Sequence, residues 1–89
     1  MEIEFDPAKD QLNRQKHGLS LGEAVDFDWG SAQIEEDIRF IYAEKRFVAT
    51  GWLGNRLHVL IYRKRGIARR VISFRKANDR EFDDYVGKT

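Results

Sequence analysis

Two apolar stretches joined by a short basic segment decide the fold: residues 57–75 read LHVLIYRKRGIARRVISFR. With the twofold period of a β-strand, Leu57, Val59 and Ile61 form a plainly apolar face, and His58, Leu60 and Tyr62 form the other, so both faces need at least partial cover. We therefore predict strands over residues 57–63 and 69–75, joined by a hairpin over residues 64–68. Upstream, Gly54-Asn55 is a two-residue hairpin signal because both residues tolerate a positive φ. It predicts a strand over residues 46–53 that continues the same antiparallel meander.

Weaker strand signals extend the sheet. Residues 1–5 alternate Ile3 and Phe5 with glutamates, which favours a short strand with one buried face. Residues 39–42 are predicted to form a further strand, and residues 31–37 a polar connection.

Helix signals precede the sheet. Asp6 can cap a helix that starts at Pro7, and the helix over residues 7–17 should stop at Gly18, which suits a left-handed turn. Its apolar content is thin, so Ala8 and Leu12 are expected to form the buried stripe.

A second helix is predicted after Gly18. Ser20 and Glu23 have the spacing of a capping box, and the helix should end around residues 28–30. Its expected buried face comprises Leu21, Ala24, Val25 and Phe27. A final short helix over residues 79–86 is predicted to begin at Asn78 or Asp79.

These elements predict one α+β domain over residues 1–89. Two N-terminal helices would pack on a four- to five-stranded antiparallel sheet, with a short C-terminal helix. The chain has 42% hydrophobic, 12% aromatic and 35% charged residues, a balance that excludes disorder. No apolar run is long enough to cross a membrane and no signal peptide is visible, so we expect a cytoplasmic protein without membrane contact.

The residue types exclude several kinds of chemistry. The chain has no cysteine, and its two histidines, His17 and His58, are far apart in sequence, so we expect no metal site. The chain has no glycine-rich phosphate loop, so we expect no nucleotide cofactor either.

The net charge of +1 hides a strong asymmetry. Residues 1–37 carry three basic and ten acidic residues, whereas residues 38–76 carry eleven basic residues against Glu44 alone. A basic segment of this kind favours a phosphate-rich or acidic partner. The alternative is that the acidic first third neutralises the basic segment within the fold.

Arginines in the predicted hairpin are the main candidate site. Arginine presents a planar fork that binds phosphate, so a cluster on one sheet face indicates RNA binding. Aromatic residues interleaved with the arginines could stack on unpaired bases. The alternative is a solvated outer face with the aromatics in the core. The candidate RNA-binding residues are Lys16, Arg65, Arg69, Arg70 and Lys76, and the candidate stacking residues are Trp52, Tyr62 and Phe74.

RNA can be cut without a metal ion when the 2′-hydroxyl attacks the adjacent phosphate. The protein must then move protons and stabilise the charged transition state. The candidate catalytic residues are His17, Arg63, Arg75 and Glu81. His17 could instead only close its helix, and His58 is as compatible with packing as with catalysis.

The order and spacing of several motifs resemble the BrnT toxins over nearly the whole chain. The matching segments are Phe5-Asp6-Pro7-Ala8-Lys9, Asn13, Lys16 to Ala24, Arg39 with Tyr42, Glu44 and Arg46, Gly51, Tyr62-Arg63, Arg70 to Ala77, and Glu81 with Tyr85.

The resemblance implies a RelE-like ribonuclease toxin of a type II toxin–antitoxin module. Such a protein would inhibit translation by cutting RNA. A BrnA-like ribbon-helix-helix antitoxin would neutralise it, and operator DNA would be contacted only through that antitoxin. A non-catalytic RNA- or protein-binding module that uses the same basic face is the alternative function.

Overall fold

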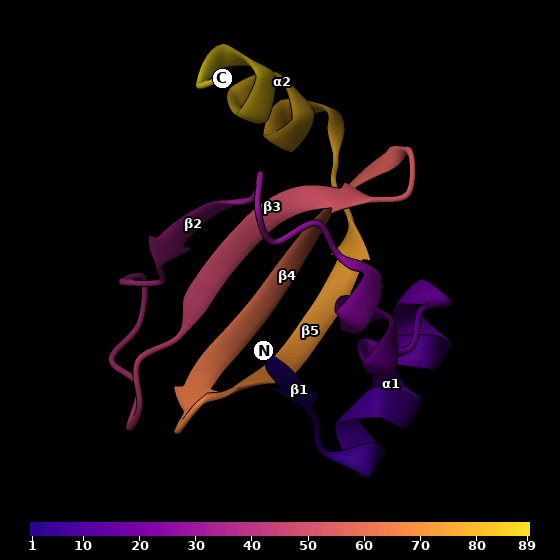
Figure 1. Cartoon of the computed structure of the whole chain (residues 1–89), viewed down its shortest axis with the longest axis vertical. Helices are drawn as coiled ribbons and strands as arrows, with labels where there is room; N and C mark the ends of the chain where they lie inside the picture. The colour runs from indigo at the N-terminus through magenta and orange to yellow at the C-terminus, as the bar shows by residue number, and fades with distance from the viewer.

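The computed structural model describes all residues from 1 to 89. One five-stranded sheet, with strand order β1-β5-β4-β3-β2, is flanked by helices (Figure 1). The elements are β1 (Glu2–Glu4), α1 (Pro7–His17), the 3-10 helix η1 (Leu21–Asp26), β2 (Gln33–Glu36), β3 (Phe47–Leu53), β4 (Arg56–Arg65), β5 (Ala68–Lys76) and α2 (Asp79–Gly87). The meander of β3, β4 and β5 and the two hairpins predicted between these strands are confirmed, whereas the hairpin predicted at residues 43–45 does not form because residues 39–42 are not a strand.

The sheet is mixed, so the prediction of an antiparallel sheet is wrong at one edge. β1 lies parallel to β5, with Glu4 opposite Arg70. The two strands are far apart in sequence, and the chain leaves β1 directly into α1 rather than through a hairpin. The hairpin signals that specify antiparallel neighbours therefore do not apply to this pair.

The edge strand β2 occupies residues that the sequence suggested were a connection. Gln33–Glu36 pairs antiparallel with β3, whereas residues 39–42, which were predicted as a strand, form irregular backbone. The side chain of Asp37 explains the change, because Oδ1 accepts hydrogen bonds from the backbone N–H and the Nε of Arg39. These local bonds replace the pairing that a strand would need.

Only one N-terminal α-helix forms, so the prediction of two is wrong. The second helical segment is the single 3-10 helix η1, and its capping box between Ser20 and Glu23 is present as predicted. Leu21 and Ala24 are buried as expected, but Val25 is exposed. The short helix ends at Asp26, and the next residue, Phe27, enters the core and forms an isolated bridge with Leu53.

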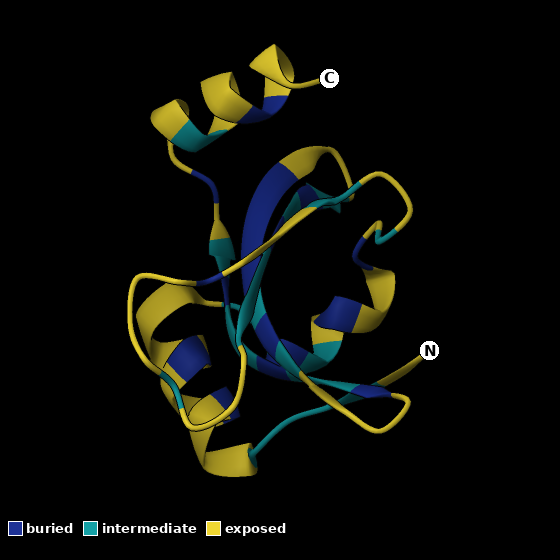
Figure 2. Ribbon diagram, turned by 90° about the vertical axis from the view of Figure 1, so that its left-hand side faces the viewer, coloured by how far each residue is buried: buried dark blue, intermediate teal, exposed yellow.

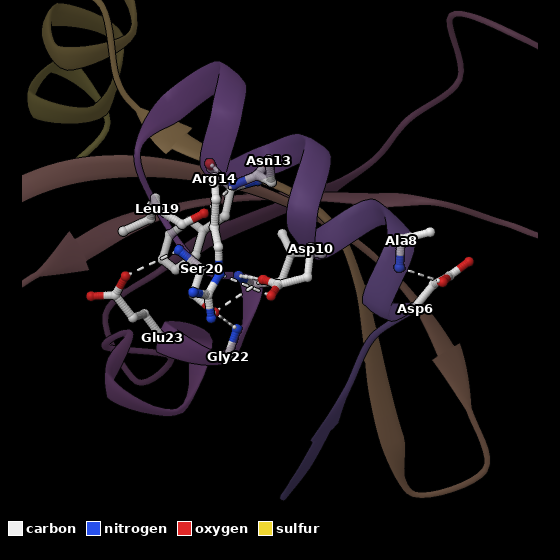
Figure 3. Close-up of polar contacts among 11 residues, drawn as sticks. Asp6, Ala8, Asp10, Asn13, Arg14, Leu19, Ser20, Gly22 and Glu23 are labelled. Carbon is white, nitrogen blue, oxygen red and sulfur yellow. Dashed lines mark hydrogen bonds and ion pairs between the residues drawn. The ribbon is translucent and has the colours of Figure 1, made fainter.

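The bounds of α1 are those predicted, but its buried side is polar (Figure 3). Leu12 is 62% exposed and Ala8 is exposed, so the predicted apolar stripe is wrong. The buried residues of α1 are Asp10 and Asn13. Asn13 donates from Nδ2 to the carbonyls of Leu19 and Phe74, and its Oδ1 accepts from the N–H of Phe74.

Apolar side chains pack on both faces of the sheet, and buried residues line its centre in Figure 2. The larger cluster lies beneath η1 and contains Leu21, Ala24, Phe27, Ala49, Leu60, Tyr62, Val71 and Phe74. The smaller cluster joins α2 to the other face and contains Leu57, Val59, Ala77 and Tyr85.

Candidate active site

A β-bulge in β5 sorts the arginines between the two faces of the sheet. Ile61 pairs with Ser73, but the next residue of β4, Tyr62, pairs with Val71, so Ile72 is the extra residue. Residues directly opposite each other share a face, and the extra residue reverses the alternation beyond it. Arg70 therefore lies on the same face as Ser73 and Arg75, whereas simple alternation would have placed Arg69 there.

The face that carries Arg63, Arg70 and Arg75 is named the arginine face. Arg63 and Arg70 are direct partners across β4 and β5, and Arg75 lies beyond Ser73 toward α2. Arg63 and Arg70 also line a hollow with Arg46 and Lys9. Strands β4 and β5, the residue before β3 and the start of α1 thus bring cationic side chains together.

Each arginine on this face has a carboxylate partner. Arg63 pairs with Glu44 at 3.1 Å, and Arg70 pairs with Glu4 at 3.4 Å. Arg65 at the end of β4 also approaches Glu4, at 3.7 Å, and is mostly exposed.

The pair of Arg75 and Glu81 has the most ordered geometry. Two parallel hydrogen bonds of 2.8 Å join the guanidinium to the carboxylate. They raise the pKa of Arg75 and lower that of Glu81, and the charge of Arg39 offsets part of the rise at Arg75. Glu81 also closes the capping box of α2 by accepting from the N–H of Asn78.

His17 and Lys16 lie at the end of α1, in a second hollow with Ile72 and Ser73. Lys9 and Ile72 line both hollows, so the one that holds His17 adjoins the one that holds Arg63. His17 therefore flanks the arginine face but lies on a different element from its arginines.

Two candidate RNA-binding residues lie on the opposite face. The guanidinium of Arg69 stacks 4.2 Å from the ring centroid of Trp29 and 5.2 Å from that of Tyr62. Lys76 pairs with buried His58 on that same face. The structure therefore does not bring Arg69 and Lys76 together with Arg63 and Arg75.

Two of the three aromatic candidates for base stacking are buried, and Trp52 is half-buried. Tyr62 and Phe74 are buried in the larger cluster, and Trp52 packs against Phe82 and Tyr85. The alternative of aromatics in the core is thus correct for Tyr62 and Phe74, whereas Trp52 is partly buried against the smaller cluster.

The connection between β2 and β3, residues 37–46, is named the β2–β3 loop. Asp37 is buried and accepts two hydrogen bonds of 2.9 Å from the guanidinium of Arg39 and one of 2.9 Å from the hydroxyl of Tyr42. The bonds from Arg39 hold the pKa of Asp37 well below its usual range, and burial raises the pKa of Tyr42. Sequence reasoning missed this network, for which the only signal was the mixture of aromatic and charged residues in this segment.

The molecule shows neither a cluster of metal-ligating side chains nor a membrane-spanning helix. No three His, Cys, Asp or Glu side chains gather as metal ligands would. None of the helices has the length and apolar character needed to span a membrane.

Comparisons with known proteins agree with this architecture. A family model described as the ribonuclease toxin BrnT of type II toxin–antitoxin systems matches residues 5–81. The crystal structure of the ribonuclease toxin BrnT from Brucella abortus is similar, with a TM-score of 0.70 and 31% sequence identity over 89% of this chain and 99% of that chain. A search of curated proteins found no match.

Proposed function

The chain belongs to the BrnT family of ribonuclease toxins of type II toxin–antitoxin systems, and we propose that its arginine face binds RNA and cuts it without a metal ion. The observation that carries this proposal is the gathering of Arg63, Arg70 and Arg75 on one sheet face. No other part of the molecule combines so many guanidinium groups with an adjoining histidine.

In the proposed reaction, the 2′-hydroxyl of one nucleotide attacks the adjacent phosphorus. The bond to the 5′-oxygen of the next nucleotide breaks, which leaves a cyclic phosphate. A base must take the proton of the attacking hydroxyl, and an acid must protonate the leaving oxygen. The negative charge that develops on the phosphate needs fixed donors nearby.

The arginines supply those donors. Arg63 and Arg75 lie on either side of the row formed by Ile61 and Ser73, so a phosphate above that row is within reach of both long side chains. The two hydrogen bonds from Arg75 to Glu81 set the orientation of its guanidinium before RNA binds. Glu44 forms a single ion-pair contact with Arg63, and an incoming phosphate would replace these carboxylates.

Proton transfer is assigned to His17, with Glu81 as a second candidate base. His17 shares a hollow with Ser73, at the middle of the arginine face. Imidazole is the side chain that most often serves as a general acid or base. The pKa of Glu81 is lowered, so its carboxylate stays ionised. An ionised Glu81 can hold Arg75 in position and can also accept a proton.

The same face accounts for neutralisation by an antitoxin. The carboxylates of Glu4, Glu44 and Glu81 show that an acidic side chain fits each arginine. We propose a BrnA-like ribbon-helix-helix antitoxin that brings its own carboxylates to this face, excludes RNA and alone contacts operator DNA. Unbound toxin would cut RNA in the cytoplasm and stop translation.

Toxicity on induced expression, together with RNA integrity, tests the proposal. Arg63→Ala and Arg75→Ala should each lower cleavage by roughly 10²- to 10³-fold, because each removes a donor to the transition state. Lysine at either position should restore only part of the activity, since an ammonium lacks the planar fork. His17→Ala should lower cleavage while RNA binding is retained.

The matched control is Arg56→Ala, which removes an exposed arginine of β4 outside the arginine face. It should remain toxic. If Arg63→Ala and Arg75→Ala are folded by circular dichroism and also remain fully toxic, the active site lies elsewhere.

A further inference from the structure

The β2–β3 loop exposes large apolar side chains beside the arginine face. Ile38 is 83% exposed, Phe40 is 65% exposed and Ile41 is fully exposed. In Figure 2 the loop is almost entirely exposed except at its start, where Asp37 is buried. Exposed apolar groups that gather in this way mark a contact surface rather than a packing element.

The two ends of the loop are held to each other. Asp37 binds Arg39 and Tyr42 at the start, and its backbone N–H donates to the carbonyl of Arg46 at 2.7 Å. Near the other end, the guanidinium of Arg46 covers the ring of Tyr42 at 4.5 Å. These contacts fix the residues that flank Phe40 while its own side chain remains open.

Two charged residues bring the loop to the arginine face. Glu44 reaches Arg63, as described above. Arg39 lies near enough to Arg75 for its positive charge to act on that guanidinium. The loop therefore contacts Arg63, one of the two arginines to which we assign phosphate binding.

Phe40 is the most exposed aromatic residue of the chain. Its ring makes one edge contact with Tyr42, with centroids 6.0 Å apart, and the guanidinium of Arg39 lies 5.8 Å from its centroid. The ring of Tyr42 is covered by Arg46, and Phe82, which is 43% exposed, already packs on Trp52. Phe40 thus combines an open aromatic face with cations on its own loop.

We propose that Phe40 stacks on an unpaired base of single-stranded RNA while Arg39 and Arg63 bind the phosphates beside that base. The inference rests on the proposed function and adds a means of selecting single strands. An aromatic face accepts any base, but only a base that is not stacked inside a duplex can reach it. The platform would hold an unpaired nucleotide next to the arginines that act on its backbone.

Charge favours RNA over protein as the occupant. The loop carries Arg39, Lys45 and Arg46 against Asp37 and Glu44, and the adjoining sheet face adds Arg63 and Arg75. Both acidic side chains are already engaged with arginines. A purely apolar partner would not need this set of guanidinium groups around one exposed ring.

Binding to two matched oligomers tests the inference. One is 2′-O-methyl oligouridine, which cannot undergo 2′-hydroxyl attack, and the other is an abasic oligomer with the same number of phosphates. Wild-type protein should bind the uridine oligomer more tightly. Phe40→Leu should weaken that binding by at least about fivefold and leave the abasic oligomer unaffected, because a stacked base contributes roughly fivefold or more.

Two variants control for ring and fold. Phe40→Tyr keeps an aromatic face and should keep the wild-type preference for bases. Phe82→Leu makes the same change at the other exposed phenylalanine and should also keep it. All variants should retain the circular dichroism spectrum of the wild type.

The outcomes separate this inference from the proposed function. If Phe40→Leu binds both oligomers as the wild type does, the platform is refuted, whereas a folded and fully toxic Arg63→Ala would refute the proposed active site. A Phe40→Leu protein that binds RNA normally but loses its antitoxin would show that the loop serves a protein partner, which also overturns the inference.

Discussion

Helices α1 and α2 attach to the same sheet by different chemistry. α2 buries Tyr85 among apolar residues, in the way that amphipathic helices usually pack. α1 leaves Leu12 exposed and attaches to β5 through the hydrogen bonds of Asn13, while Asp10 bonds the start of η1. The comparison shows that an apolar stripe is not the only means of docking a helix, and that directional hydrogen bonds can fix its position instead.

The largest test of this contrast is Asn13→Ala. The change removes three hydrogen bonds and leaves the buried N–H and carbonyl of Phe74 without their side-chain partner. We expect the free energy of unfolding to fall by roughly 3 kcal/mol, because unsatisfied buried polar groups are costly. Denaturation in urea measures it, with exposed Gln11→Ala on the same helix as the control. A change of similar size in both variants would contradict the polar anchor.

A smaller effect that depends on pH is expected at Asp10. Hydrogen bonding from the N–H of Leu21 lowers the pKa of Asp10 from its ordinary value of 3.8. A carboxyl with a lowered pKa stabilises the fold above that value and loses the effect as the pH falls through its folded-state pKa. Asp10→Asn should therefore be less stable than the wild type at neutral pH, and the gap should narrow below pH 3.8.

Urea midpoints at neutral and acidic pH measure that gap. Asp26→Asn, at an exposed position of η1, is the matched control and should stay close to the wild type throughout. A gap that widens in acid would show that the charge of Asp10 does not hold α1 in place.

The smallest effect concerns the hydrogen bond of the Tyr85 hydroxyl, one of several polar contacts of α2. The hydroxyl of Tyr85 donates to the carbonyl of Ser31 at 3.0 Å. Tyr85→Phe keeps the apolar contacts and should cost only about 1 kcal/mol in thermal or urea denaturation. A loss of unfolding free energy as large as that of Asn13→Ala would contradict the view that the two helices attach by different chemistry.

The sequence predicted the parts of the fold that depend on local signals. Alternation and Gly54-Asn55 specified β3, β4 and β5, and the capping residues located the starts of α1 and α2. It did not predict the parallel pairing of β1 or the position of β2, because both depend on contacts between distant residues. The helical pattern of apolar residues also gave a wrong prediction for the buried side of α1, because its buried residues are polar.

The sequence predicted which types of residue form the candidate site, but it did not predict which of them share one face of the sheet. Arginines in the hairpin indicated a shared basic face, yet the bulge at Ile72 decides that Arg70 joins Arg75 and that Arg69 does not. An inserted residue of this kind has no signature in the alternation of Val71, Ile72 and Ser73. Phe40 escaped notice because a strand was expected there, and burial of the other aromatics became visible only in three dimensions.

The side chain of Asn13 has a consequence for self-association. β1 pairs with β5 only from Ala68 to Arg70, so the rest of the outer edge of β5 has no neighbouring strand. At Phe74 the amide of Asn13 donates and accepts as the peptide group of such a neighbour would. Unpaired strand edges are templates for aggregation between chains. One asparagine on a helix therefore takes the place of a sixth strand and blocks edge-to-edge polymerisation at that point of the sheet.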